Sequence, residues 1–264
     1  MSEGGKGPCP LLVVTALEDE ARAFTREVKG SVGLRSGHGA VDPFLSSSPD
    51  LARRPLLDVV WVGPGKSGMG ALSGLLSSGK YSRVLFVGLA GALVPDLFPG
   101  AIVVVEEVLS SSGERFLPSR DFFMNFFRPM FGEWGKGSVR FGRIFSAEAL
   151  VGTPREKKRL AGETGAIAVD MESSGWLDVA ARAGIPATVV RAISDGVEDS
   201  LPPEILSFVT PEGGVSLGGI LRALLVRPAL LYELLLLGAS IRQGRRALSR
   251  LGREVLSALP EEGR

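Results

Sequence analysis

Residues 166–195 read AIAVDMESSGWLDVAARAGIPATVVRAISD, a succession of apolar run, helical segment and apolar run. The apolar runs, 166–169 and 187–193, have the composition of buried strands. The segment between them, 172–183, has helical character. The same alternation recurs along the chain from residue 11 onward. We therefore expect an α/β domain in which helices cover a parallel or mixed sheet.

The other expected elements follow from the same patterns. Short apolar runs predict strands at 11–16, 57–62, 83–87 and 101–107 and from Phe141 onward. Helices are expected after Glu18, across 67–78 and after Pro154. In two segments the apolar residues recur at no regular spacing. We interpret 30–56 as a long loop and 111–137, with its six phenylalanines, as a flap or aromatic pocket wall.

Composition excludes several classes of function. The chain has 264 residues, 45% of them hydrophobic, which suffices for one large domain. Its net charge of +1 provides no general attraction for nucleic acid. Its single cysteine, Cys9, cannot form an internal disulfide, and its single histidine, His38, cannot build a multi-histidine metal site. The first ten residues lack the layout of a secretion signal. We expect a cytoplasmic protein without a metal or cofactor.

The C-terminal segment differs in kind, so we divide the chain into a main domain, 1–215, and a helical extension of it, 216–264. The extension is leucine-rich, and Pro228 divides it in two. It contains eight arginines against four glutamates, and Glu233 interrupts an apolar stretch too short to cross a bilayer. Such helices could lie in a membrane interface or line a channel for an apolar substrate. Alternatively, they pack as a helical pair on the core or on a second subunit.

Acidic residues follow three of the expected strands, in apolar surroundings where a carboxylate is costly. Glu20 follows the first strand, Asp170 and Glu172 follow a later one, and Asp195 follows the run VVRAIS. The carboxyl ends of strands frame the ligand crevice of α/β sheets, so these groups predict one acidic site. Helix capping is the alternative, because acidic residues also stabilise helix N-termini.

Seven sequence motifs, three of which contain these carboxylates, follow one another along the chain. Together the motifs resemble the signature segments of the purine nucleoside phosphorylase and methylthioadenosine/adenosylhomocysteine nucleosidase family. They are TALEDEA (15–21), KSGMG (66–70), VGLAGAL (87–93), PGAIVV (99–104), FSAEALV (145–151), AVDMES (168–173) and VVRAISD (189–195). The resemblance covers residues 11 to about 200. It implies a three-layer α-β-α sandwich with a central mixed sheet, a homo-oligomer, and a purine nucleosidase or nucleoside phosphorylase.

The resemblance also implies roles for matching positions. Glu172 would bind the ribose hydroxyls, with Met171 packing on the sugar. Asp195 would protonate or hydrogen-bond purine N7, and Glu20 would activate the attacking water, with Arg191 beside it. These groups suit the reaction, because breaking the glycosidic bond puts positive charge on the sugar and negative charge on the base. Asp195 can donate a proton only if it is protonated, which desolvation by the preceding apolar strand would favour.

The same resemblance indicates the lining of the pocket. The base would contact Ser194, Leu150 and Val151, although the family often has an aromatic residue in this last region. The attacking water, or a phosphate co-substrate, would lie near Gly88, Leu89 and Ser67.

The nucleophile itself is a separate question. Phosphorylases of the family bind phosphate with an arginine and a serine near this glycine turn, where the chain has Phe86 and Leu89. Losing these groups weakens a phosphate site, and Glu20 would repel the anion. Water is therefore the expected nucleophile. The alternative is that Lys66, Ser67 or the backbone amides of GPGKSGMG hold phosphate.

The extension narrows the expected substrate. LPPEIL (201–206) and LRALLVRPALLYELLLL (221–237) resemble the C-terminus of hopanoid-associated phosphorylases, the branch that removes adenine from adenosylhopane. This implies adenine release in hopanoid side-chain biosynthesis and a peripheral contact with the inner membrane face. The alternatives are methylthioadenosine/adenosylhomocysteine nucleosidase, futalosine hydrolase, and a nucleoside-binding protein without turnover. The retained Glu20, Glu172 and Asp195 argue against the last.

Overall fold

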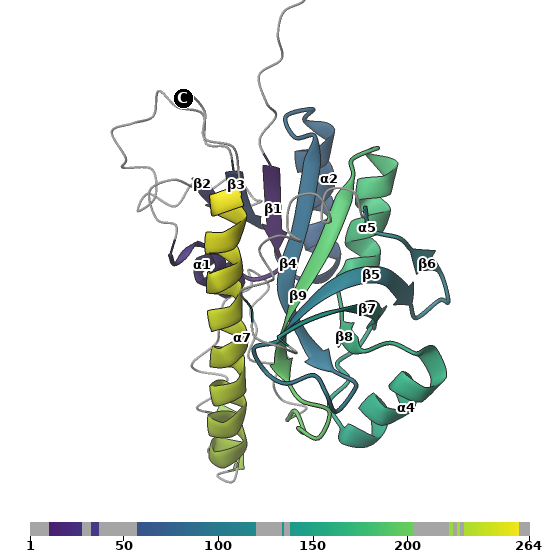
Figure 1. Cartoon of the computed structure of the whole chain (residues 1–264), viewed down its shortest axis with the longest axis vertical. Coiled ribbons are helices and arrows are strands. Elements are labelled where there is room, and N and C mark those ends of the chain that lie inside the picture. Colours follow the sequence, from purple (N-terminus) through teal and green to yellow (C-terminus); the bar gives the residue numbers. More distant parts are fainter. Residues whose placement is uncertain are drawn as a thin grey trace, which may run out of the picture.

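A mixed sheet of nine strands forms the centre of the computed structural model (Figure 1). The structure describes residues 11–27, 33–36, 57–119, 134, 138–202, 222–223, 226–227 and 230–258. The strands are β1 (Leu11–Thr15), β2 (Gly33–Ser36), β3 (Leu57–Trp61), β4 (Arg83–Ala92), β5 (Ile102–Ser110), β6 (Arg115–Phe116), β7 (Val139–Ser146), β8 (Ala168–Asp170) and β9 (Ala187–Asp195). The helices are α1 (Glu18–Thr25), α2 (Gly65–Ser77), α4 (Pro154–Thr164), α5 (Ser173–Arg182) and α7 (Leu230–Ala258).

The sheet order is β2-β3-β1-β4-β8-β7-β5-β6, and β9 pairs with both β4 and β5. Strand β4 is the centre of this arrangement, because it pairs in parallel with β1 and β9 and antiparallel with β8. Helices α2 and α5 pack on one face, and α1 and α7 pack on the other. The expected three-layer α/β architecture with a mixed sheet is confirmed.

Several elements differ in extent from the sequence-based expectation. Strand β4 continues to Ala92, five residues beyond the expected strand 83–87 and through a glycine-rich stretch. Strand β2 lies inside the expected loop 30–56, most of which falls outside the described residues. The expected flap, 111–137, contains the short strand β6, but the five phenylalanines after Phe116 lie outside the described part of the chain.

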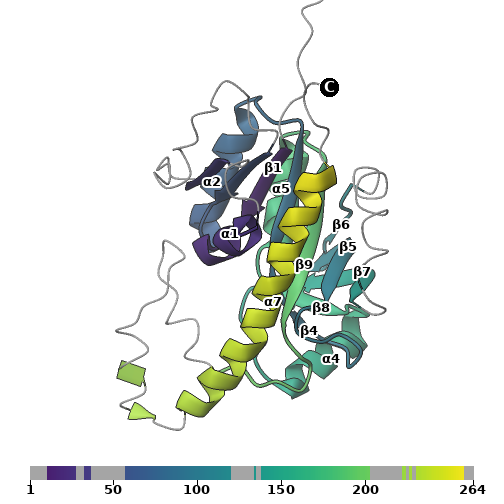
Figure 2. The same cartoon turned by 60° about the vertical axis from the view of Figure 1, so that its left-hand side comes forward.

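Helix α7 is the main described element of the C-terminal extension, and it runs along α1 and β9 (Figure 2). Two glycines allow the close contact. A Cβ atom on Gly252 would lie 1.9 Å from the carbonyl oxygen of Phe24, and one on Gly244 would lie 2.9 Å from that of Ile193. Leu248 and Leu251 of α7 are fully buried in the core between this helix and the sheet. The C-terminal half of α7 is therefore part of the hydrophobic core.

No helix in the described ranges combines the length and the apolar composition that crossing a membrane requires.

Candidate active site

Glu20 lies in the first turn of α1, directly beyond β1, and its carboxylate is buried. One carboxylate oxygen, Oε2, accepts a hydrogen bond of 3.0 Å from the Leu17 amide. The other, Oε1, accepts one of 2.9 Å from the Leu89 amide of β4. Burial raises the pKa of Glu20, and these amides and the Arg191 guanidinium oppose the rise. Glu20 thus caps its helix and also reaches across to the central strand.

Arg191 is the cation of this part of the site. It is buried on β9, with Nη2 lying 2.6 Å from Asp170 Oδ2 and donating to Ser173 Oγ over 2.7 Å. Gly88 of β4 makes room for it, because a Cβ atom there would lie 2.5 Å from Arg191 Nη1 and 3.1 Å from Glu20 Oε1. The absence of a side chain at Gly88 therefore lets Glu20 and Arg191 occupy the same space beside β4. We call Glu20 and Arg191 the nucleophile centre, after the role beside the attacking water that the resemblance implies for them.

Glu172 lies in the turn between β8 and α5, immediately after the half-buried Met171. It occupies the N-cap position of α5, yet its side chain makes no capping hydrogen bond. Asp170 makes a capping hydrogen bond instead, because its carboxylate accepts a hydrogen bond of 3.3 Å from the Ser173 amide. Burial raises the pKa of Glu172 to about 7; the negative charge of Asp170 adds to this and Arg191 opposes it. Helix capping therefore does not account for Glu172.

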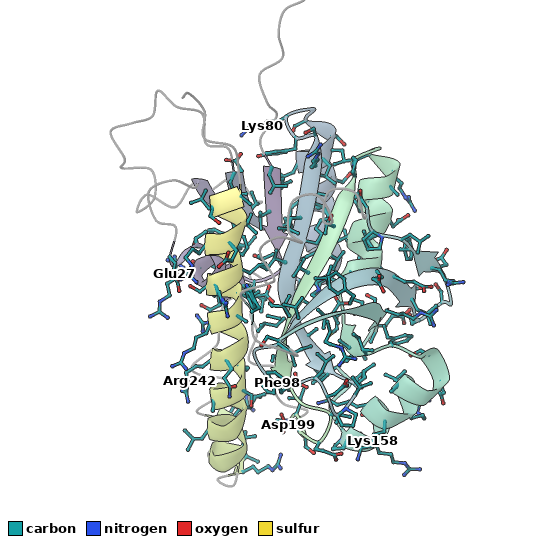
Figure 3. All side chains as sticks on the ribbon, viewed as in Figure 1. Glu27, Lys80, Phe98, Lys158, Asp199 and Arg242 are labelled. Atoms are coloured by element: carbon teal, nitrogen blue, oxygen red, sulfur yellow. The ribbon has the colours of Figure 1, made fainter. Side chains whose placement is uncertain are left out.

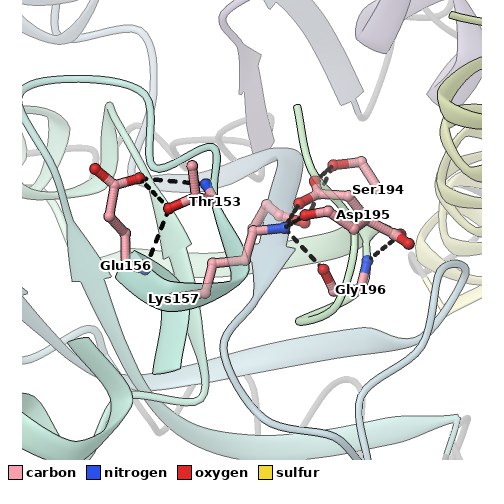
Figure 4. A network of polar contacts seen from close by, with 8 residues as sticks. Thr153, Glu156, Lys157, Ser194, Asp195 and Gly196 are labelled. Carbon is pink, nitrogen blue, oxygen red and sulfur yellow. Dashed lines mark hydrogen bonds and ion pairs between the residues drawn. The ribbon is translucent and has the colours of Figure 1, made fainter. Parts of the chain in front are cut away.

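Asp195 ends β9 and is buried next to a lysine (Figure 4). Nζ of Lys157, on α4, lies 2.5 Å from Asp195 Oδ2 and also donates to the carbonyl oxygens of Gly196 at 2.7 Å and Asp199 at 3.0 Å. Ser194 Oγ donates to Asp195 Oδ1 over 2.6 Å. The Asp195 carboxylate is therefore both removed from water and in direct contact with an ammonium group. We call Lys157 and Asp195 the acid centre, after the proton-donor role that the resemblance implies for Asp195.

Lys157 was missed by the sequence reasoning. The run PREKKRL looks like the exposed face of a charged helix, and Lys158 beside it is indeed exposed (Figure 3). A signal was present, however. Lys157 precedes Leu160 by three residues, so the two share a face of α4, and they are the buried residues of that helix.

A β-bulge brings Asp195 to its position. The pairing of β4 with β9 shifts so that Ala90 faces Ile193 but Gly91 faces Asp195, which re-aims the side chain. A Cβ atom on Gly91 would lie 2.9 Å from Asp195 Oδ2, so this glycine too makes room for a carboxylate. Gly88 and Gly91 are three residues apart, about 10 Å along a regular strand. Strand β4 thus places the nucleophile centre and the acid centre side by side.

The remaining predicted residues have different surroundings. Leu150 and Val151 lie half-buried in the loop between β7 and α4, and the Leu201 amide donates to the next residue of that loop, Gly152, over 2.7 Å. Ser67 lies in α2, but its side chain is outside the described part of the structure. Phe86 is fully buried against the ring of Trp176, whose centroid is 5.2 Å away, so it belongs to the core.

Comparison with known proteins gives both a family and a fold. A family model described as the phosphorylase superfamily matches residues 11–225. No curated protein matches the sequence.

Solved structures match over nearly the whole chain. A 5′-methylthioadenosine/S-adenosylhomocysteine nucleosidase from Helicobacter pylori has a TM-score of 0.65 and 16% identity, with 96% of this chain and 100% of that chain covered. Futalosine hydrolase of the same organism gives 0.65 and 16%, with coverages of 96% and 99%. A putative 5′-methylthioadenosine/S-adenosylhomocysteine nucleosidase from Francisella philomiragia gives 0.59 and 14%, with coverages of 95% and 98%. At these identities, the likeness establishes a shared fold.

Proposed function

Because this chain belongs to the phosphorylase superfamily and is thus an enzyme of the nucleosidase or nucleoside phosphorylase type, we propose that it cleaves the N-glycosidic bond of an adenine nucleoside. The observation that carries the proposal is the arrangement along β4. Gly88 admits the nucleophile centre, and Gly91 admits the acid centre. A nucleoside lying across the end of β4 would present its sugar to the first and its base to the second.

Each centre meets a requirement of the reaction. As the bond breaks, negative charge grows on the base and positive charge on the sugar. The Lys157 ammonium group, in contact with Asp195, would supply the proton that Asp195 passes to the base at N7. Glu172 would bind the ribose hydroxyls, and its negative charge would stabilise the developing cation. Glu20 would take a proton from the attacking water, for which its raised pKa makes it better suited than an exposed carboxylate.

We infer that the nucleophile is water and not phosphate. The Leu89 amide, a donor that could otherwise bind an anion, already donates to Glu20. The buried carboxylate beside it would repel phosphate. Phe86 is in the core and contributes no donor. The test is cleavage in buffers with and without phosphate. We expect an unchanged rate and free sugar as product, whereas sugar 1-phosphate formed at a rate that rises with phosphate would contradict hydrolysis.

The 5′ group distinguishes the candidate adenine nucleosides from one another. We propose adenosylhopane, because the extension resembles that of the hopanoid-associated branch and exposes large apolar side chains. Val226 is 83% exposed and Leu235 is 62% exposed. Base release from adenosylhopane in detergent micelles should exceed that from 5′-methylthioadenosine and from futalosine in kcat/KM. Preference for either soluble nucleoside would favour the corresponding alternative activity, and tight binding without base release would favour a nucleoside-binding protein.

A further inference from the structure

Five arginines surround one hollow between α1 and α7, away from the proposed active site. The hollow has a volume of about 330 Å³, and its lining consists of Ala23 and the arginines Arg22, Arg26, Arg242, Arg245 and Arg246. Arg22 lies in α1, Arg26 is its C-cap residue, and the other three arginines come from α7. Their spacing of three and four residues places each set on one helix face. The tight contact of Gly252 with α1 holds the two faces together.

The acidic residues beside the hollow do not neutralise all of its arginines. Arg22 pairs with Glu18 at 2.6 Å, and Arg245 approaches Asp19 at 3.5 Å. Among the described residues, Arg26, Arg242 and Arg246 form no ion pair, and all three are exposed. Like charges four residues apart on a helix repel one another.

Folding does not account for this cluster. Helix α7 is held by the apolar residues and glycines on its opposite face, whereas Arg242 lies on the side that faces away from the sheet (Figure 3). These guanidinium groups therefore contribute little to the packing of the core. A bound anion would relieve the repulsion between them.

We propose that this hollow binds a phosphate group. Guanidinium groups donate paired hydrogen bonds that match phosphate oxygens, and several of them favour an anion with more than one negative charge. The site is distinct from the nucleophile centre, because Glu20 of the same helix α1 reaches β4 whereas the arginines line the groove with α7. The phosphate could belong to a soluble phosphorylated compound or to a phospholipid headgroup, which share this chemistry.

The test uses the full-length chain and two probes. Inorganic pyrophosphate represents a soluble ligand and is followed by titration calorimetry. Vesicles of phosphatidylglycerol and phosphatidylcholine represent a lipid surface and are followed by co-sedimentation, with pure phosphatidylcholine vesicles as the blank. The variant is Arg242→Gln/Arg246→Gln. Its control is Arg155→Gln/Arg159→Gln, which removes two exposed arginines at the same spacing from α4.

We expect at least one probe to bind, with affinity reduced about tenfold or more in the α7 variant and about twofold or less in the α4 control. Binding of pyrophosphate alone supports a soluble phosphate ligand, and binding of the anionic vesicles alone supports a headgroup. Binding of neither probe, or equal losses in the two variants, overturns the proposal. Because all four arginines are exposed, both variants should fold, which circular dichroism verifies. Base release is a separate measurement, so failure here leaves the proposed activity untouched.

Discussion

Asp195 and Lys157 form a buried ion pair whose two members come from different elements, β9 and α4. Removing one member of such a pair leaves a buried charge without compensation, which is more damaging than removing both. The remaining contacts of Lys157, to the carbonyl oxygens of Gly196 and Asp199, hold the loop after β9 against α4. Lys157 therefore acts as a positioning residue for the proposed acid.

A double-mutant cycle tests this coupling. Lys157→Met should lower the free energy of unfolding by about 3 kcal/mol, because Asp195 is left buried without its cation. Adding Asp195→Asn should recover part of that loss, since the neutral amide is cheaper to bury. Asp195→Asn alone should lower kcat by about 100-fold or more with a smaller effect on substrate binding. Additive losses of stability in urea unfolding would disprove the coupling, and near-normal kcat would disprove the acid role.

Glu172 provides a prediction on pH dependence. Its pKa is raised from the ordinary 4.5 to about 7, so the folded protein holds this proton more tightly than the unfolded chain does. The resulting contribution to stability is present below pH 4.5 and is lost as the pH rises through 7. Glu172→Gln removes the effect, so the variant should gain stability relative to the natural chain between pH 5 and pH 8. Urea unfolding at both pH values measures this gain.

The control for Glu172 is Glu163→Gln at an exposed position of α4. A stability difference between Glu172→Gln and the natural chain that is the same at both pH values would contradict the prediction. The proposed activity should show the opposite trend. Ribose hydroxyls need an ionised acceptor, so kcat/KM should rise with pH up to about 7 and then level off.

At the scale of elements, the sequence predicted most strands and helices because their patterns are local. The carboxylates of the candidate site could be singled out for the same reason: Glu20, Glu172 and Asp195 each lie at or soon after a strand end. The extension of β4 through Gly88 and Gly91 could not be predicted this way. Those glycines make room for Arg191 and Asp195, which lie about a hundred residues further along the chain, so only the folded sheet explains them. Lys157 was missed because its carboxylate partner lies 38 residues further along the chain, on a different element.

Two glycines of helix α7 allow a prediction about how substitutions change the stability of the protein. A Cβ atom on Gly252 would overlap the Phe24 carbonyl oxygen, whereas one on Gly238 has nothing within 4 Å. Gly238→Ala should therefore stabilise the protein by about 0.5–1 kcal/mol through helix propensity. Gly252→Ala should destabilise it by about 2 kcal/mol, because the overlap outweighs the same gain. The midpoints of urea unfolding measure both, and equal effects would contradict the packing of α7 on α1.

At the scale of the molecule, α7 anchors the C-terminal extension to the core of the main domain. Its own residues Leu248, Leu251 and Val255 are fully buried, and exposing each would cost about 1.5–3 kcal/mol. Their sum is of the order of the total stability of a typical domain, about 5–15 kcal/mol. Deleting the extension would therefore unfold the core and lower every activity alike. A role in handling an apolar substrate must be tested by substitutions that leave the core intact.

Val226 and Leu235 meet this condition, because both are largely exposed in the extension. If they contact the apolar 5′ group of adenosylhopane, Val226→Ser/Leu235→Ser should lower kcat/KM for adenosylhopane about tenfold or more, since each lost contact removes buried apolar area. Cleavage of 5′-methylthioadenosine should stay within about twofold, because the site carboxylates are unchanged. Leu117→Ser, at a position 76% exposed next to β6, is the control. Equal loss on both substrates, or no loss on either, would remove the lipid-handling role from the extension.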